Sequence, residues 1–152
     1  MENCIFCKIV KGEIPSVKIW DDEKHLAFLD LNPNTEGVTL VITKNHFDSD
    51  ATDMPEKEYS ELMLATKKVV KIIEKGLDCK RVAIVMEGLG VNHVHIKLYP
   101  IHGLNEKFVE TWADDKIFFK KYEGYISTQL GPELSIKERQ KIANKILKNN
   151  GS

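Results

Sequence analysis

Three side chains that could take part in chemistry alternate along the stretch VNHVHIKLYP, residues 91–100: His93, His95 and Lys97. Side chains on a β-strand point alternately to its two faces, so the pattern predicts a strand with these groups on one face and apolar residues on the other. Two histidines at this spacing lie about 6.5 to 7 Å apart along the backbone. An imidazole can act as a nucleophile, a general base, a metal ligand or a hydrogen-bond donor to a phosphate. The alternative is a polar strand face with two ordinary histidines.

A second group of possible ligands begins near the start of the chain. Cys4 and Cys7 form a C-x2-C pair, the spacing at which a tight turn can present two thiolates to one metal. His46 follows shortly after the run TLVITK and offers a further ligand. The cysteine pair alone is also compatible with two small buried residues, because a structural zinc usually takes four protein ligands.

Hydrophobic patterns predict the elements that must position these residues. Three short strand-like runs, separated by DDE and LNPNTEG, favour an antiparallel meander: 17–20, 25–30 and 38–43. Apolar residues then recur with helical spacing from Asp53 to Glu74, and Gly76 closes the helix. A strand over 81–86, the turn EGLG and the histidine strand follow. This order predicts an α+β domain with the helix on one face of an antiparallel sheet.

The pattern changes after Pro100. The segment NEKFVETWADDKIFFKKY mixes helical and aromatic signals, and EGYISTQLGPEL is typical of a loop. The segment SIKERQKIANKIL, 135–147, predicts a final helix that begins with a capping box. We therefore divide the chain into a main domain, 1–104, and a helical C-terminal extension, 105–152, that packs on the same domain.

Composition and charge argue against several classes of protein. The chain has 152 residues, of which 42% are hydrophobic and 30% charged, as in an ordinary globular domain. Its net charge is -1, so we expect neither a nucleic acid nor a membrane as partner. No run approaches the roughly 18 apolar residues of a membrane span, and the start of the chain lacks the order of a signal peptide. With only three cysteines, these features predict a cytoplasmic protein without a disulfide framework.

Three blocks of this sequence resemble the histidine triad (HIT) family of nucleotide hydrolases and transferases. The blocks are CIFCKIVKGEIPS, LAFLDLNPNTEGVTLVITKNH and VNHVHIKLYP, in the family's order. The last block corresponds to the family motif His-φ-His-φ-His-φ-φ, in which φ is apolar, with Lys97 at the position of the third histidine. The resemblance implies an α+β fold with a five-stranded antiparallel sheet and a long helix. It also implies a homodimer and a purine nucleotide or related phosphate ester bound near the histidine strand.

The resemblance implies roles for the ligand and motif residues. In zinc-bearing members the metal is held by the positions that match Cys4, Cys7, His46 and His93. Two thiolates and two imidazoles are the tetrahedral set of a closed, structural zinc site. The family's nucleophile is the middle histidine of the motif, here His95. Its ring attacks the α-phosphorus of a nucleotide and forms a nucleotidyl-imidazole that water then cleaves.

The nucleotide pocket of the family carries over to five further positions. Ile5, Phe6, Phe28 and Leu31 would surround the base, and Asp30 would accept hydrogen bonds from both ribose hydroxyls. For the four apolar residues the alternative is ordinary core. For the aspartate the alternative is a cap of the turn LNPN, because aspartate commonly forms such turns.

Three features depart from the family pattern, and one of them is that the extension after Pro100 is longer than in the small members of the family. Lys97 replaces the third motif histidine, and its ammonium can contact a phosphate oxygen but does not shuttle a proton near neutral pH. The turn EGLG lacks the Asn and the Gln or Ser common in the family, which leaves Gly88 and Gly90 to offer backbone donors. His25 and His102 match no motif position, so we expect them at the surface or partly packed.

These features favour a nucleotide phosphohydrolase or nucleotidyl transferase that acts at the α-phosphate. A dinucleoside polyphosphate and a nucleoside phosphoramidate are both possible substrates. The replacement by Lys97 favours a second hypothesis, a zinc-stabilised nucleotide-binding protein with little or no turnover. A third is a structural dimer module without activity or ligand.

Overall fold

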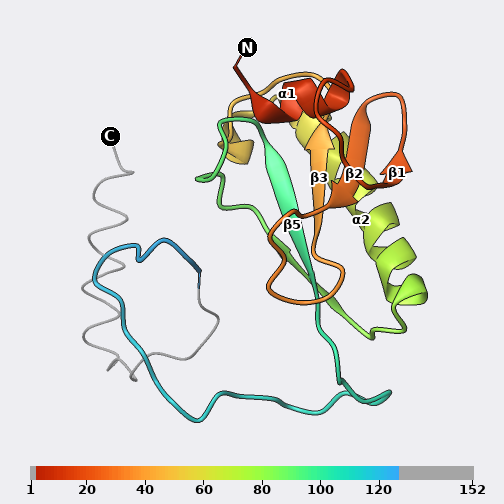
Figure 1. Cartoon of the computed structure of the whole chain (residues 1–152). Helices are drawn as coiled ribbons and strands as arrows, with labels where there is room; N and C mark the ends of the chain where they lie inside the picture. Colours follow the sequence, from red (N-terminus) through yellow and green to blue (C-terminus); the bar gives the residue numbers. More distant parts are fainter. Residues whose placement is uncertain (1–2, 127–152) are drawn as a thin grey trace. The chain divides into compact units, whose positions relative to one another are not determined.

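Five antiparallel strands form the sheet that carries the site (Figure 1). The structure is a computed structural model that describes residues 3–126. The strands are β1 (Lys18–Asp21), β2 (His25–Leu29), β3 (Thr39–Thr43), β4 (Val82–Val85) and β5 (His95–Pro100). Their order in space is β1-β2-β3-β5-β4, and each neighbouring pair is antiparallel. The predicted meander and the predicted α+β class with a five-stranded sheet are therefore confirmed.

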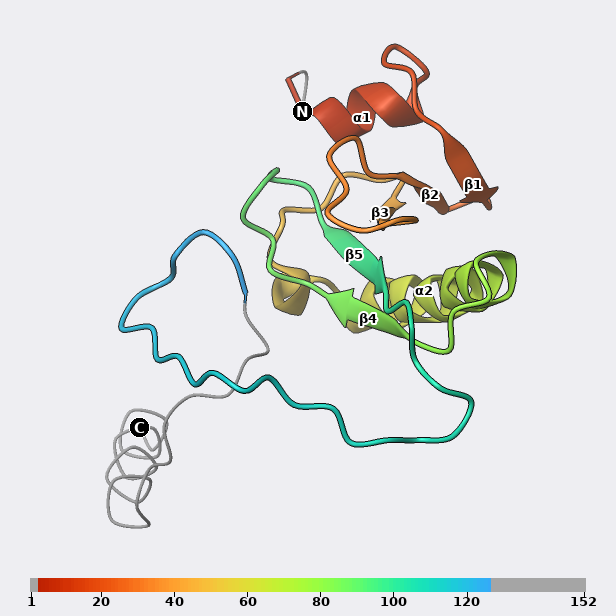
Figure 2. The same cartoon turned by 60° about the horizontal axis from the view of Figure 1, so that its bottom comes forward.

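The long helix α2 (Glu56–Gly76) lies along one face of the sheet (Figure 2). Its buried stripe consists of Leu62, Ala65, Thr66, Val69, Val70 and Ile73. The stripe packs on alternate residues of the strands, including Ala27, Val41, Ile96 and Leu98. Full burial of one such aliphatic side chain contributes about 1.5–3 kcal/mol. The helix begins later than the predicted Asp53, because Ala51–Asp53 forms a separate short 3-10 helix and Pro55 precedes the first turn of α2.

A short helix, α1 (Ile5–Val10), covers the other face of the sheet. Phe6 and Ile9 are its buried residues. They pack on a second apolar cluster formed by Leu26, Phe28, Leu40 and Ile42. Sequence analysis predicted only a tight turn here, because six residues are too few for a helical period to show. The helix separates the two cysteines of C-x2-C by about one turn, which allows both thiols to face the same ligand.

The alternation predicted for the histidine strand is present. The apolar residues on the α2 side are fully buried: Val94, Ile96 and Leu98. His95 and Lys97 lie on the opposite face, where they pair across the sheet with Ile42 and Leu40. Regular pairing begins only at His95, so His93 lies just before the strand and not within it.

The structure describes the chain after β5 only as far as residue 126. The chain divides into two compact units, Met1–Phe108 and Val109–Ser152. Residues 105–126 contain neither helix nor strand. The final helix predicted over 135–147 lies outside the described residues, so the helical extension stays a prediction. Within the described part of the chain, no helix has the length and apolar character needed to cross a membrane.

Candidate functional site

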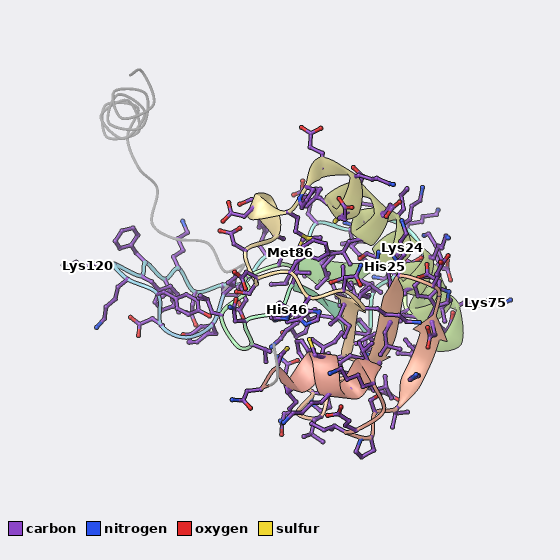
Figure 3. All side chains as sticks on the ribbon, turned by 90° about the horizontal axis from the view of Figure 1, so that it is seen from above. Lys24, His25, His46, Lys75, Met86 and Lys120 are labelled. Carbon is purple, nitrogen blue, oxygen red and sulfur yellow. The ribbon has the colours of Figure 1, made fainter. Side chains whose placement is uncertain are left out.

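Two cysteines at the start of α1 lie close to two histidines, one from the segment after β3 and one from the segment before β5. Cys4 directly precedes α1, Cys7 lies within it, His46 follows β3 and His93 precedes β5. Their ligand atoms all lie within 4.8 Å of one another. Figure 3 shows the side chain of His46 next to α1. The structure therefore brings together the four residues predicted as metal ligands, in an arrangement that could bind a metal.

The spacing of these atoms fits a tetrahedral zinc site. Nδ1 of His93 lies 3.4 Å from Sγ of Cys4 and 3.6 Å from Sγ of Cys7, and Nδ1 of His46 lies 3.4 Å from the same Cys7 sulfur. Zinc bonds of about 2.3 Å to sulfur and about 2.0–2.1 Å to nitrogen place tetrahedral neighbours roughly 3.6 Å apart. Four protein ligands leave no open position, so a zinc ion here would be structural.

The ring of His93 is held in the tautomer that a metal requires. Its Nε2 lies 2.9 Å from the carbonyl oxygen of Thr43. A carbonyl only accepts, so Nε2 carries the proton and Nδ1 turns its lone pair toward the thiols. Burial lowers the pKa of His93 and favours this neutral form. The role of Thr43 was not predicted, because a backbone carbonyl leaves no signal in the residue type.

The surroundings of Cys7 disfavour its thiolate form. Burial and the neighbouring Cys4 raise the pKa of the Cys7 thiol above its ordinary value. A protonated thiol binds metal weakly, whereas a divalent cation stabilises the thiolate. Metal binding at this group is therefore expected to release protons and to weaken as the pH falls.

Two loop residues connect the segments that carry the histidine ligands. Nε2 of His46 lies 3.6 Å from Oδ1 of Asp48. Asn92 donates from Nδ2 to the same carboxylate oxygen at 3.0 Å, and its Oδ1 accepts from the backbone N–H of Ser49 at 2.9 Å. These bonds join the segment after β3 to the segment before β5. Asp48 and Asn92 are not among the predicted site residues, and their only signal in the sequence is that each stands within two residues of a predicted ligand.

His95 has one ring nitrogen that donates a hydrogen bond and one that has no partner among the described residues. Its Nδ1 lies 2.8 Å from the carbonyl oxygen of His93, so Nδ1 carries a proton, and in the neutral ring Nε2 keeps its lone pair. The side chain is buried, and its ring packs edge to face on Phe6 with centroids 5.4 Å apart. A hydrogen bond and a ring contact thus fix the orientation of this imidazole.

Lys97 supplies a positive charge on the same face of β5 as His95. Its side chain is half-buried, and its ammonium forms no hydrogen bond or ion pair with any residue in the described range 3–126. A partly buried ammonium is stable only if water or an anion solvates it. The charge is therefore available to an anion that binds next to His95.

The four apolar residues predicted around a base divide into two pairs. Phe6 and Phe28 are buried in the second cluster, with ring centroids 5.9 Å apart, as ordinary core residues would be. Ile5 and Leu31 are 45% and 89% exposed. The exposed pair is open to a ligand, whereas the phenylalanines could at most form the floor of such a site.

Asp30 follows β2 and caps the turn after it. Its Oδ1 accepts a hydrogen bond from the backbone N–H of Asn32 at 2.9 Å, which is the alternative role considered from the sequence. The second oxygen, Oδ2, has no partner among the described residues. The carboxylate can therefore support the turn and still accept from a ligand.

The glycine turn between β4 and β5 has one position that only glycine fits. Gly88 has a φ of 72°, and a Cβ there would lie 2.5 Å from the carbonyl oxygen of Ser49. A Cβ at Gly90 would meet nothing within 4 Å. Gly88 is therefore required for the close approach of this turn to the loop after β3, and Gly90 is not.

A cavity of about 820 Å³ opens next to the metal group. Its lining includes Cys4 and His46 from that group, Ile5 and Gly90 from the predicted nucleotide site, and Asp48. The other residues predicted to bind nucleotide do not line it. The cavity thus borders both predicted sites without coinciding with either.

The two histidines outside the motif differ in environment. His25 is only 4% exposed, and its Nδ1 lies 3.1 Å from Oδ1 of Asp22. The expectation of a surface or partly packed position was therefore wrong for His25, because the turn before β2 supplies a carboxylate partner that makes burial possible. His102 is exposed, and its Nε2 donates to the carbonyl oxygen of Glu36 at 2.9 Å.

Comparisons with known proteins point to one family. The HIT domain profile matches residues 11–102. Protein hit of Bacillus subtilis is 39% identical over 124 residues, which cover 75% of this chain and 83% of that protein. The adenosine 5'-monophosphoramidase HNT1 of Candida albicans is 30% identical over 149 residues, 92% of this chain and 97% of that enzyme. The crystal structure of SMU.412c from Streptococcus mutans UA159 superposes with a TM-score of 0.70 at 29% identity, over 98% of this chain and 86% of that one. The chain belongs to the histidine triad (HIT) family.

Proposed function

We propose that this protein is a nucleotide phosphohydrolase or nucleotidyl transferase that acts at the α-phosphate through a nucleotidyl intermediate on His95. The observation that carries the proposal is the 2.8 Å hydrogen bond from Nδ1 of His95 to the carbonyl of His93, which leaves Nε2 as an oriented nucleophile. The relative named as an adenosine 5'-monophosphoramidase supports a nucleotide substrate.

The proposed reaction proceeds in two displacements. The lone pair on Nε2 of His95 attacks the α-phosphorus, and the bond from phosphorus to the leaving group breaks. The leaving group departs with that electron pair and takes a proton from solvent. Water then attacks phosphorus and loses a proton, the phosphorus–Nε2 bond breaks, and the neutral imidazole returns. If an alcohol or amine replaces water, the same sequence transfers the nucleotidyl group.

We propose that the ammonium of Lys97 and the glycine turn between β4 and β5 bind the phosphate group that His95 attacks. The ammonium of Lys97 would stabilise the negative charge that develops on the phosphate oxygens. Backbone N–H groups of Gly88 and Gly90 would add hydrogen bonds to the same oxygens. The free ammonium of Lys97 supports this role, because no carboxylate of the described residues neutralises it.

The nucleoside is proposed to lie on the α1 side of the sheet. Ile5 and Leu31 would contact the two faces of the base, above the floor formed by Phe6 and Phe28. Oδ2 of Asp30 would accept from the ribose hydroxyls. The exposure of the two aliphatic side chains and the free carboxylate oxygen support this assignment.

We propose zinc as the metal held by Cys4, Cys7, His46 and His93. Two thiolates and two imidazoles at tetrahedral spacing favour zinc over harder cations. Such an ion would tie α1 to the sheet and contribute to folding. Its thiolate ligands need reducing conditions, so we place the protein in the cytoplasm.

The family resemblance supports a homodimer, which we retain as a proposal. We also retain, as a proposal, a HIT domain over 1–104 and a C-terminal extension over 105–152 whose predicted helix lies at 135–147.

A second function is favoured by Lys97, which stands where a third histidine would complete the motif. A zinc-stabilised nucleotide-binding protein with little or no turnover would keep the charge and lose the proton transfer. Incubation of the wild type and His95→Ala with adenosine 5'-phosphoramidate and a diadenosine polyphosphate separates the two. Release of AMP by the wild type alone supports the enzyme. Binding without release supports the binding protein, and absence of both leaves the structural dimer module.

A further inference from the structure

The proposed function assigns no ligand to the cavity of about 820 Å³ next to the metal group. Its volume lies within the range of about 300–1,000 Å³ that is typical of small-molecule sites. It touches the nucleotide site at Ile5 and Gly90 and extends from there over Cys4 and His46. In a displacement at phosphorus, the leaving atom lies opposite the attacking atom, so the leaving group must extend beyond the nucleoside and phosphate. A space that meets the proposed phosphate turn at Gly90 and reaches from there to the metal group suits that leaving group.

The charge of the lining distinguishes between possible leaving groups. The lining contains one carboxylate, Asp48, and neither lysine nor arginine. Two thiolates would balance the charge of a zinc ion, so the adjacent metal group would add no net positive charge. Lys97, the proposed phosphate contact, is not part of this lining. A leaving group made of phosphates would therefore bring its negative charges toward Asp48 without compensation, whereas an ammonium would be attracted.

The carboxylate of Asp48 is held with one oxygen free. Its Oδ1 accepts from Nδ2 of Asn92 at 3.0 Å and lies 3.6 Å from Nε2 of His46. Asn92 is itself fixed by the backbone N–H of Ser49. No residue among those described contacts Oδ2 of Asp48 by a hydrogen bond or ion pair. The side chain is 79% exposed, so this oxygen is accessible to a cation in the cavity.

We propose that this cavity is the leaving-group site and that Asp48 selects nucleoside phosphoramidates whose amine carries a second, positively charged group, in preference to dinucleoside polyphosphates. The inference rests on the proposed attack of His95 on the α-phosphorus. In that step the phosphorus–nitrogen bond breaks with its electron pair on nitrogen, and the amine takes a proton from solvent. The distant ammonium of the amine stays protonated throughout and contacts Asp48.

Three adenosine phosphoramidates of equal length test this assignment. Their amines end in an ammonium, a methyl group or a carboxylate, and kcat/KM is measured for each at low and high salt. We expect the wild type to prefer the ammonium over the methyl group by about threefold to fivefold at low salt, the scale of an exposed ion pair. The carboxylate should be the poorest substrate. The differences should shrink at high salt because the charges are screened.

Asp48→Asn should abolish the preference, although its amide oxygen can still accept from Asn92. Asp48→Lys should reverse the order and favour the carboxylate. The matched control is Asp53→Asn, which removes the same charge from an exposed neighbour outside the lining and should keep the wild-type order. Zinc content is measured in every variant. The readout is the ratio of kcat/KM between two substrates of the same variant. A loss of metal or stability lowers kcat/KM for all three substrates alike, so it does not change this ratio.

Two outcomes would overturn the assignment in different ways. If the wild type hydrolyses all three compounds through His95 with equal kcat/KM, or if Asp48→Asn keeps the preference, the leaving-group site is wrong and the proposed function stands. If the wild type hydrolyses neither these compounds nor unsubstituted adenosine phosphoramidate, the proposed function fails and the assignment fails with it.

Discussion

His93 and His95 donate hydrogen bonds to backbone carbonyls through opposite ring nitrogens. His93 uses Nε2, which lies 2.9 Å from the oxygen of Thr43, and His95 uses Nδ1, which lies 2.8 Å from the oxygen of His93. His93 therefore offers Nδ1 to the two thiols, and His95 keeps Nε2 free. The two histidines stand two positions apart in the sequence. The carbonyl that accepts from each ring determines which nitrogen remains available, so the two rings suit different chemistry.

The free Nε2 predicts that His95→Ala abolishes turnover while nucleotide binding survives. Loss of a covalent nucleophile should lower kcat by more than about 10³-fold, because His93 is a proposed metal ligand and a lysine is a poor nucleophile while it is protonated. Wild type quenched during the reaction should contain an acid-labile nucleotidyl group on His95. Rapid-quench mass spectrometry detects the adduct, and calorimetry with AMP measures binding.

A matched control for this substitution is His102→Ala. His102 is exposed and donates only to the carbonyl of Glu36, so the variant should turn over like the wild type. Hydrolysis by His95→Ala at the wild-type rate would contradict the mechanism. Binding by a wild type that turns over no nucleotide would favour the binding protein.

The isolated ammonium of Lys97 predicts that Lys97→Ala slows the reaction without stopping it. One charge contact to a phosphate in the transition state is worth about 10²- to 10³-fold in kcat. Single-turnover rates for the wild type and the variant measure this loss. Lys97→His restores the third histidine of the motif, and a rise in rate would show that lysine had detuned the site. An unchanged rate in Lys97→Ala would mean that the ammonium does not contact the reacting phosphate.

The fold follows from periodic patterns, and the parts that lack a pattern were missed. The buried stripe of α2 and the alternation along β5 each repeat often enough to be read directly. Helix α1 is too short for its period to show, so a turn was predicted in its place. Pairing in the sheet was predictable as a meander only for its first three strands, because the position of β4 at the edge depends on contacts distant in sequence.

In the candidate site, residue types could be read from the sequence, but the contacts between distant residues could not. Cys4 and His93 are 89 positions apart, and spacing alone left the cysteine pair open to a structural explanation. The resemblance to the family, and not periodicity, connected the four ligands. Thr43 acts through its backbone, and Asn92 acts through an amide that bridges two loops. Neither role has a signature in a single sequence, since each depends on where the loops meet.

The metal group predicts that purified protein carries about one zinc per chain. Cys4→Ser should lose the metal and lower the free energy of unfolding by more than about 3 kcal/mol, while kcat of the remaining folded protein changes less. For a chain of this size the loss corresponds to a fall of roughly 10 °C in Tm. Elemental analysis and calorimetry measure the two effects.

The control for Cys4→Ser is Cys79→Ala, which removes a buried thiol that belongs to no ligand group of residues 3–126. It should keep the full zinc content and lose only packing energy. Protein that has never met a chelator and contains no zinc would refute the assignment. A fully stable Cys4→Ser variant without activity would instead mean that the metal acts in the chemistry.

The two oxygens of Asp30 predict separable effects on nucleotide binding. Asp30→Asn keeps an acceptor for the backbone N–H of Asn32 and loses the carboxylate charge, whereas Asp30→Ala loses both functions. If Oδ2 binds the ribose, Asp30→Asn should weaken AMP binding by about 1–3 kcal/mol, the scale of hydrogen bonds to a charged group. The loss should largely vanish for 2',3'-dideoxy-AMP, which lacks both hydroxyls. Calorimetric titration of each variant with both ligands measures the difference, and equal weakening toward the two ligands would show that Asp30 supports only the turn.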